Sequence, residues 1–369
     1  MKNNKLIVKT KSKTYPIYFG NNILKSTGLL IKKNLPNVKN ICIIADKKLP
    51  VNILKKLTTS LKKYKIRIYK LNASEKTKNI LVANKIIEQL LIENFNRTDC
   101  VIALGGGIIG DLSAFVSNLT KRGLKFINVP TTLLAQVDAS IGGKTGINAN
   151  QGKNLIGTFY QPDFILSDVS ILKTLPQREM ISGYGEILKH SLILDKHFFL
   201  WLVKNGSKII NRNNVTCLKK AIIKSCKIKC DVVQKDEKEE NLRMVLNFGH
   251  TFAHGFESTK NFSKKLNHGE AVLLGMMMAC KLSNKNRLLS NKELAIIENH
   301  FIDLRLPLHI NKIFKKQEIN KIVYFMQKDK KNINEKISLI LLIKIGKTSK
   351  PKSFSLSTRE MKKFLGSFY

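Results

Sequence analysis

The sequence predicts two domains: an α/β domain with a parallel sheet at residues 1–175, and a mostly α-helical domain at residues 176–369. A chain of 369 residues is too long for one compact core and suits about two domains. In the first half, short apolar runs alternate with stretches of helical spacing, which is typical of a parallel sheet covered on both faces. From about residue 177 onward, long helical segments replace this alternation.

The elements of the first domain follow from its apolar runs. Strands are expected at 6–9, 15–19, 40–46, 65–71, 100–104 and 125–129, the first two as an opening pair. Helices are expected near 51–62 and 78–94, where apolar residues recur at i, i+3 and i+4.

The second domain is expected to hold long helices and one late hairpin. The helical segments are 177–203, 211–234, 246–259, 268–285 and 291–302. The apolar run 337–343 is predicted to be a strand that returns in a hairpin with 354–356.

The charge of the chain is unusual. Lys and Arg number 65 against 26 acidic residues, which gives a net charge of +39 and raises nucleic acid as a partner. However, only nine of these residues are Arg, and the lysines are spread along the whole chain. Nucleic-acid binders tend to concentrate Arg and exposed aromatic residues. We therefore interpret the charge as a compositional bias, expect no specific nucleic-acid partner, and infer that the field favours an anionic substrate.

Apolar patterning and cysteine usage bear on the compartment. No stretch of about 18 apolar residues is free of charge, and the N-terminus has no apolar signal-peptide core. The six cysteines show no paired spacing, which is typical of a reducing compartment. Cys226 and Cys230 lie one helical turn apart, but no His lies near them in sequence. We expect a cytoplasmic protein with no membrane partner and no metal at these cysteines.

A glycine-rich loop follows one of the expected strands. Residues 105–111 fit G-x-G-x-x-G and open a helix, where backbone N–H groups can bind a pyrophosphate. The loop does not follow the first strand, and the acidic residue expected about 20 positions later is missing. A tight strand–helix turn without a ligand is the alternative. The Gly- and Lys-rich region 128–157 that follows favours an anionic, polyhydroxylated ligand.

Four residues of the second domain suggest a metal site. Glu186, His250, His254 and His268 lie on expected helices, and His250 and His254 share a helical face. His and carboxylate ligands with open positions are typical of catalytic Zn²⁺. Packed or surface histidines are the alternative, and His190, one turn after Glu186, competes on spacing alone.

Several motifs together resemble the signature blocks of the 3-dehydroquinate synthase family, in the family's order and over essentially the whole chain. They are Gly105-Gly-Gly-Ile-Ile-Gly-Asp111, Pro130-Thr-Thr132, Asp138-Ala-Ser-Ile-Gly-Gly-Lys144, Gly152-Lys-Asn154, Gly183-Tyr-Gly-Glu186-Ile-Leu-Lys189, Asp236-Glu237, Leu242-Arg243, Asn247-Phe-Gly-His250-Thr-Phe-Ala-His254 and His268-Gly-Glu270. Single blocks are shared with the wider superfamily of glycerol-dehydrogenase-like proteins, whereas the whole set is specific.

The resemblance implies a carbon–oxygen lyase of the shikimate pathway, which leads to chorismate and the aromatic amino acids. The implied substrate is 3-deoxy-D-arabino-heptulosonate 7-phosphate, and the products are 3-dehydroquinate and phosphate. The implied steps are transient oxidation by NAD⁺, phosphate elimination, reduction by the same NADH, ring opening and aldol closure. The implied metal is Zn²⁺ or Co²⁺, held by Glu186, His250 and His268. His190 matches no ligand of the family.

The resemblance also assigns the remaining site residues. Those matched to substrate binding and catalysis are Arg122, Lys144, Asn154, Lys189, Lys229, Arg243, Asn247, His254 and Lys330. Those matched to NAD are Asp46, Glu75, Lys78, Gly107, Ile108, Ile109, Gly110, Asp111, Thr131, Thr132, Lys144, Lys153, Ile171, Leu172, Lys173 and Thr174.

The residues themselves leave several of these assignments open. Glu75 and Lys78 also fit a simple i, i+3 pair at a helix start, and Lys331 competes with Lys330. Arg243 and Asn247 are four residues apart and are expected on one helical face beside His250.

Arg122 is expected at the edge of the sheet opposite the glycine loop. It lies in the turn between the helix that follows the loop and the strand at 125–129, so a solvated loop charge is the plain interpretation. The resemblance implies instead that Arg122 contacts the phosphate site of a neighbouring subunit. We therefore predict a homodimer.

Three other functions compete with this one. A zinc- or iron-dependent polyol dehydrogenase of the glycerol type would share the loop and the metal domain, but Glu rather than Asp at 186 and the blocks at 138–144 and 152–154 favour the synthase. A different sugar-phosphate cyclase would keep most of the residues, although Arg243 and Lys330 favour a substrate with both carboxylate and phosphate. A basic nucleic-acid-binding protein would rest on the charge alone.

Overall fold

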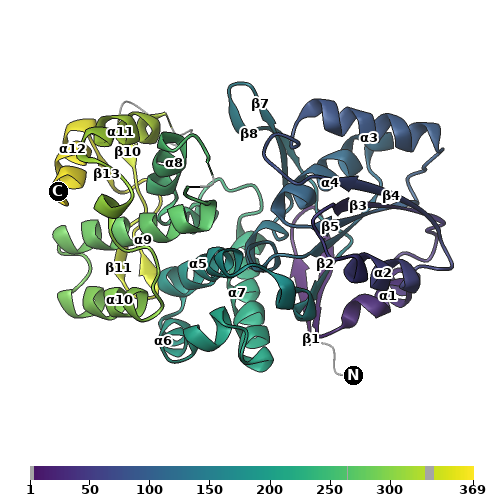
Figure 1. The fold of residues 1–369 in the computed structure, drawn as a ribbon, viewed down its shortest axis with the longest axis horizontal. Helices are drawn as coiled ribbons and strands as arrows, with labels where there is room; N and C mark the ends of the chain where they lie inside the picture. Colours follow the sequence, from purple (N-terminus) through teal and green to yellow (C-terminus); the bar gives the residue numbers. More distant parts are fainter. Residues whose placement is uncertain (1–3, 264, 329–335) are drawn as a thin grey trace. The chain divides into compact units, whose positions relative to one another are not determined.

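The structure is a computed structural model that describes residues 4–263, 265–328 and 336–369 (Figure 1). It forms two compact units. Unit 1 consists of Met1–Pro176 and Leu218–Lys238, and unit 2 consists of Gln177–Cys217 and Glu239–Tyr369. Within the described residues, no helix combines the length and the apolar composition needed to cross a membrane.

Unit 1 is built on a seven-stranded sheet in the order β1-β2-β9-β6-β5-β3-β4. Only β1 and β2 pair antiparallel, and all the other pairs in this sheet are parallel. The strands are β1 (Asn4–Lys9), β2 (Thr14–Gly20), β3 (Asn40–Asp46), β4 (Lys65–Leu71), β5 (Cys100–Gly105), β6 (Lys125–Pro130) and β9 (Phe164–Asp168). The predicted α/β fold with a parallel sheet is therefore confirmed.

Helices cover both faces of this sheet. Successive residues of β3 point to opposite faces, so Ile43 packs in one apolar cluster and Cys42 and Ile44 in another. The first cluster includes residues of α1 and α2, and the second includes residues of α3 and α4 (Figure 1). These helices are α1 (Thr27–Asn34), α2 (Val51–Ser60), α3 (Ile80–Ile92) and α4 (Gly107–Leu119). Burial on both faces explains why the central strands are almost entirely apolar.

Unit 2 is mostly helical, with α9 packed against both α5 and α8. Its helices are α5 (Gln177–Leu194), α6 (Lys196–Ile210), α8 (His250–Thr259), α9 (His268–Lys285), α10 (Asn291–Asp303), α11 (Ile319–Gln327) and α12 (Thr358–Gly366). The short strands β10 (Ile337–Ser338) and β13 (Ser355–Leu356) pair antiparallel, as do β11 (Leu342–Lys344) and β12 (Lys347–Thr348). Instead of the one strand predicted at 337–343, the structure has two short strands, β10 and β11, and each pairs with a different partner.

Gly249 fixes the start of α8 against α9. It has φ +79°, which favours glycine, and a Cβ there would lie 2.7 Å from the backbone nitrogen of Met276. Gly275 of α9 lies equally close, since a Cβ there would be 2.2 Å from the carbonyl oxygen of Gly249. Only glycines allow the two helices to approach in this way, and His250 is the first residue after the contact.

Several predicted elements differ from the structure. The helix expected at 246–259 is divided into the 3₁₀ helix η5 (Leu242–Asn247) and α8, because Gly249 interrupts it. The helix expected at 177–203 ends at Leu194, since Asp195 caps the new helix α6. The hairpin of β7 (Lys144–Ala149) and β8 (Gly152–Phe159) was not predicted.

The chain passes between the units differently from the single boundary expected after residue 175. The segment Leu218–Lys238, which contains most of helix α7 (Val215–Lys235), belongs to unit 1. Polar contacts explain this placement, because Cys226 Sγ donates to the carbonyl oxygen of Gln136 at 3.3 Å and Glu237 bonds to both Ser12 and Gln161. Composition alone cannot reveal that a long helix of the second half packs with the first.

Candidate functional site

Three side chains of unit 2 come together as a candidate metal centre. Glu186 lies on α5, while His250 and His268 are the first residues of α8 and α9. One ligand atom from each lies within 4.8 Å of the others. His250 Nε2 is 3.8 Å from Glu186 Oε1, and the two imidazole centroids are 5.7 Å apart. The structure thus brings together the three residues that the family resemblance assigned to the metal.

The carboxylate of Glu186 is the observation that tests this assignment. Its side chain is 1% exposed, and neither of its oxygens accepts a hydrogen bond from any described residue. Lys189, one turn later and also buried, forms an ion pair with it. Buried carboxylates normally have hydrogen-bond partners, and a bound metal ion would give these oxygens the partner they lack. Two histidines and one glutamate are also a known ligand set of catalytic zinc, so the residues fit a divalent metal.

Other residues fix the start of α9. Asn267 caps the helix by accepting from the Glu270 N–H, and the Glu270 carboxylate accepts from the Asn267 N–H in return. Arg178 of α5 binds the same carboxylate through two nitrogens, at 2.6 and 2.5 Å. Because His268 lies inside this capping box, its backbone is held from both sides.

His268 also has a charged neighbour on α8. Its Nδ1 lies 3.0 Å from Glu257 Oε2. Burial of the ring acts to lower the pKa of His268, but the Glu257 carboxylate outweighs burial and raises this pKa to about 9.

Other predicted residues of unit 2 lie near the metal group or in the segment before it. The ring of His254 is 5.8 Å from that of His250. Arg243 and Asn247 lie on η5 rather than on one helix with His250, so the expected shared helical face is wrong. Asn247 Nδ2 donates to Glu239 at 2.7 Å, a residue that the sequence did not suggest. Lys330 lies outside the described residues.

His190, the competing ligand, is fully buried on α5 and also places a ring nitrogen within 4.8 Å of a Glu186 oxygen. His190 is not part of the group in which the ligand atoms of Glu186, His250 and His268 all lie within 4.8 Å of one another.

In unit 1, the glycine loop lies between β5 and α4. Gly105 ends the strand, Gly106 caps the helix and Gly107 begins it. A Cβ on Gly105 would lie 2.6 Å from that of Ile109, so the tight turn requires glycine there. The Thr131 N–H donates to the carbonyl oxygen of Gly105 at 2.9 Å, which sets the end of β6 beside the loop. The first turn of α4 thus offers N–H groups suited to an anion.

Lys78 connects three segments of the predicted nucleotide site. Its buried Nζ donates to Asp111 Oδ2 and to Asn154 Oδ1, both at 2.5 Å. Asp111 lies on α4, and Asn154 lies on β8 with φ +54°. Helix α3 begins only at Ile80, so the alternative of a plain helix-start pair for Glu75 and Lys78 does not describe them.

Asn148 is a further residue that the sequence did not suggest. Its Nδ2 donates to the Glu75 carboxylate at 2.8 Å and to the Glu75 carbonyl oxygen at 2.9 Å, and its Oδ1 accepts from the Asn154 N–H at 3.0 Å. Burial acts to raise the pKa of Glu75. The hydrogen bond from Asn148 and the charges of Lys153 and Lys78 outweigh burial and lower this pKa. The Glu75 carboxylate is therefore fixed and ionised.

Lys229 shows how α7 contributes to unit 1. Its Nζ donates to both Asp138 Oδ1 and the Asp138 carbonyl oxygen, each at 2.6 Å. The Lys229 side chain is 7% exposed. Lys144, another predicted substrate residue, is exposed at the first position of β7.

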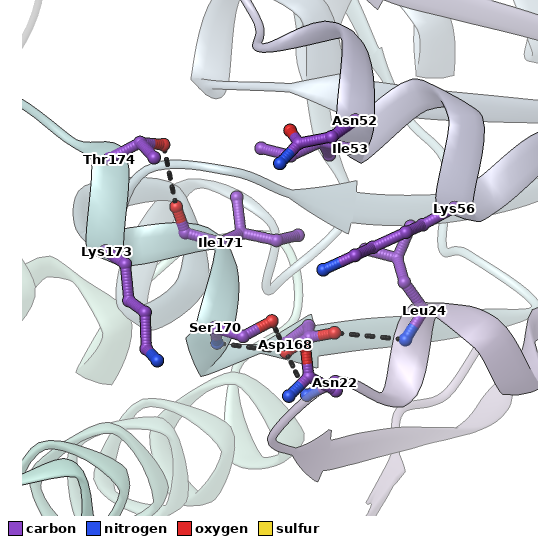
Figure 2. A pocket seen from close by; sticks show the side chains of 10 residues that line it. All are labelled: Asn22, Leu24, Asn52, Ile53, Lys56, Asp168, Ser170, Ile171, Lys173 and Thr174. Atoms are coloured by element: carbon purple, nitrogen blue, oxygen red, sulfur yellow. Dashed lines mark hydrogen bonds between the residues drawn. The ribbon is translucent and has the colours of Figure 1, made fainter.

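A pocket of about 180 Å³ lies beside the predicted segment Ile171–Thr174 (Figure 2). Ile171, Lys173 and Thr174 line it. Asp168, which is 1% exposed, accepts from the backbone N–H groups of Asn22 at 2.8 Å and Ser170 at 3.0 Å. The Asp168 carboxylate therefore connects the turn after β2 to the residues just before Ile171–Thr174, and it holds both sides of the pocket in place (Figure 2). Leu172 is buried and does not line the pocket, and neither does Asp46, which ends β3.

Arg122 lies at the sheet edge opposite the glycine loop. It ends the short η2 helix (Thr120–Arg122) with φ +61°, and β6 begins beside the first residue of β5. The side chains around it form an open depression, lined by Leu91, Asn96, Arg97, Leu119, Lys121 and Arg122.

Solved structures with this fold include sugar-phosphate cyclases and metal-dependent dehydrogenases. A 2-deoxy-scyllo-inosose synthase, complexed with carbaglucose-6-phosphate, NAD⁺ and Co²⁺, has a TM-score of 0.86 at 23% identity over 99% of this chain and 100% of that chain. A probable glycerol dehydrogenase from Sinorhizobium meliloti has a TM-score of 0.67 at 12% identity over 95% and 96%. The chain therefore has the fold shared by these two classes of enzyme.

Sequence comparison is more specific. The family model for the 3-dehydroquinate synthase N-terminal domain matches residues 68–182, and the C-terminal model matches 183–332. A 3-dehydroquinate synthase of Pelagibacter ubique is 52% identical over 342 residues, which are 93% of each chain. One of Bartonella tribocorum is 40% identical over 314 residues, 83% of this chain and 82% of that one. The chain belongs to the 3-dehydroquinate synthase family.

Proposed function

We propose that this protein is a carbon–oxygen lyase that converts 3-deoxy-D-arabino-heptulosonate 7-phosphate to 3-dehydroquinate and phosphate in the shikimate pathway. The observation that supports it most is the 52% identity to a curated 3-dehydroquinate synthase over 93% of both chains. The Glu186, His250 and His268 group gives independent support, because it fits the divalent metal that such chemistry uses.

In this proposal, Glu186, His250 and His268 hold Zn²⁺ or Co²⁺, and the residues around Gly107, Glu75 and Thr174 bind NAD. When bound, the metal polarises the substrate hydroxyls, and NAD⁺ takes up and returns one hydride within a turnover. The chain's own residues bind and orient the substrate, which carries a carboxylate and a phosphate. Much of the protein's contribution is therefore positioning and electrostatics.

The charged side chains have separate tasks in each unit. In unit 2, the buried cations of Lys189 and Arg243 orient anionic groups of the substrate, and His254 moves a proton near His250. In unit 1, Asp138 holds the Lys229 ammonium in place, and Lys144 and Asn154 add further substrate contacts. Lys330 keeps its assignment to the substrate as a prediction.

The test of the reaction is phosphate release with trace NAD⁺. The protein is incubated with the heptulosonate phosphate, Zn²⁺ and NAD⁺ at far below the substrate concentration, with His268→Ala as the control. We expect many phosphates per NAD⁺, no net NADH, and 3-dehydroquinate identified by mass spectrometry. Stoichiometric NADH without phosphate would favour the polyol dehydrogenase, and another carbocycle would favour a different cyclase.

We further propose a cytoplasmic homodimer in which Arg122 serves the partner's substrate phosphate, without specific nucleic-acid or membrane partners. An Arg fits bidentate phosphate binding, and all six cysteines are free. The test reassembles Arg122→Ala with His268→Ala after unfolding. Random pairing makes half the dimers hybrids with one intact site of two, so activity should return to about a quarter of wild type. No recovery in proven hybrid dimers would contradict action across the dimer.

A further inference from the structure

A buried carboxylate of α8 lies beside one of the metal-binding histidines. Glu257 is 6% exposed and lies two helical turns after His250 on the same helix. Its Oε2 is 3.0 Å from Nδ1 of His268, which begins α9. The contact therefore joins the two helices that carry the histidine ligands, and it engages the ring nitrogen that does not have to bind the metal.

The two histidines share the same arrangement of their ring nitrogens. His250 Nδ1 lies 3.3 Å from the carbonyl oxygen of Phe248, while its Nε2 is the nitrogen 3.8 Å from Glu186 Oε1. In His268, the Glu257 carboxylate takes the place of that carbonyl oxygen. An acceptor at Nδ1 fixes the proton there, orients the ring and leaves the lone pair of Nε2 for a metal.

We propose that Glu257 is a positioning residue of the metal site: it accepts the Nδ1–H of His268 and holds the ring so that Nε2 faces the metal. The inference rests on the proposed metal-dependent function. Glu257 differs from the ligands because it lies outside the group formed by Glu186, His250 and His268 and acts through His268. Its negative charge also makes the imidazole a stronger donor, which a backbone carbonyl does to a smaller extent.

The test measures Zn²⁺ affinity of the full-length metal-free protein by competition with a chromophoric chelator. The variants are Glu257→Ala, which removes the acceptor, and Glu257→Gln, which keeps a neutral oxygen of the same reach. Glu318→Gln is the matched control, because Glu318 binds Lys260 at the end of α8, at 2.9 Å, without contacting His268. We expect Glu257→Ala to weaken Zn²⁺ binding about 10- to 100-fold and Glu257→Gln to weaken it less. Glu318→Gln should bind as wild type does.

A second measurement separates positioning from a purely structural role. At saturating Co²⁺, the visible absorption spectrum of Glu257→Ala should change in position or intensity, because the freed ring alters the ligand geometry, while that of Glu318→Gln should not. Unchanged Zn²⁺ affinity and an unchanged Co²⁺ spectrum in folded Glu257→Gln and Glu257→Ala would overturn the proposal. If Glu257→Ala fails to fold, Glu257→Gln decides alone. Wild-type protein that binds Zn²⁺ but releases no phosphate would refute the proposed function and leave this inference standing.

Discussion

His300 is a buried histidine whose effect on stability does not depend on the proposed chemistry. It lies on α10 with 1% of its surface exposed, and its Nε2 is 2.8 Å from the hydroxyl of Tyr184. The ring also packs edge-on against Phe199. Burial lowers the pKa of His300 to about 4, although Asp303 acts in the opposite direction. The folded protein therefore keeps this ring neutral at pH values where an unfolded histidine is protonated.

The sign and size of the effect follow from the two pKa values. The unfolded chain binds the proton near pH 6.5, and the folded protein does so only near pH 4. The contribution of His300 to stability is thus fully present above pH 6.5, falls as the pH drops below that value, and is lost by about pH 4. The gap between the two pKa values corresponds to roughly 3 kcal/mol in total, and about 2 kcal/mol of it falls between pH 7 and pH 5.

The assay compares urea unfolding of the wild type with that of His300→Gln, which stays neutral at every pH. Trp201, the single tryptophan of the chain, lies on α6 of the same unit and reports its unfolding by fluorescence. Chelator removes metal from all samples, and His309→Gln, at an exposed position, is the control. We expect the wild type and the control to lose about 2 kcal/mol more than His300→Gln from pH 7 to pH 5. Equal losses in all three proteins would refute the reasoning.

Three further predictions concern ligands. His268→Ala should lower Zn²⁺ affinity strongly and His190→Ala should not, as measured by chelator competition; the reverse order would reject the ligand set. Asn148→Ala should raise the KM for NAD⁺ about tenfold at little cost to kcat, because one hydrogen bond to a charged group is worth about 1.5 kcal/mol or more; an unchanged KM in initial-rate measurements would contradict this. Added salt should raise the KM for substrate moderately, and DNA binding should be weak and indifferent to sequence; a preference of several kcal/mol for one DNA sequence would contradict the interpretation of the charge.

Strands buried on both faces of the sheet are among the elements that the sequence predicted correctly. The strand at Asn40–Asp46 is an apolar run with two buried faces, and such a run has few alternatives between helices. The hairpin β7–β8 was not predicted because every residue of β8 is exposed or half-buried, so its side chains give no alternation of buried and exposed positions. The hairpin also contains Asn154 with φ +54°. Asn tolerates this left-handed conformation, but the presence of an Asn in the sequence does not predict it.

The site could be predicted only where chemistry-bearing residues form motifs. Glu186, His250 and His268 are such residues, whereas Asn148 and Glu257 become meaningful only through contacts across the fold. Asn148 reaches Glu75, which is 73 residues away in sequence, and an Asn in a Gly-rich stretch is unremarkable by itself. Spacing was also misleading for Arg243 and Asn247, because the four-residue rule assumes an α-helix, whereas both residues lie on the 3₁₀ helix η5 and Gly249 separates that helix from His250.

Helix electrostatics explain why the metal group needs more than its ligands. His250 and His268 are both first residues of helices, and helix N-termini carry a partial positive charge that opposes a cation. The buried Lys189 ammonium adds to this opposition. The carboxylates of Glu186 and Glu257 lie in the same unit and supply the negative charge that offsets it. Removing Glu257 therefore takes away charge as well as an acceptor, which is why Glu257→Gln, with its oxygen retained and its charge lost, distinguishes the two contributions.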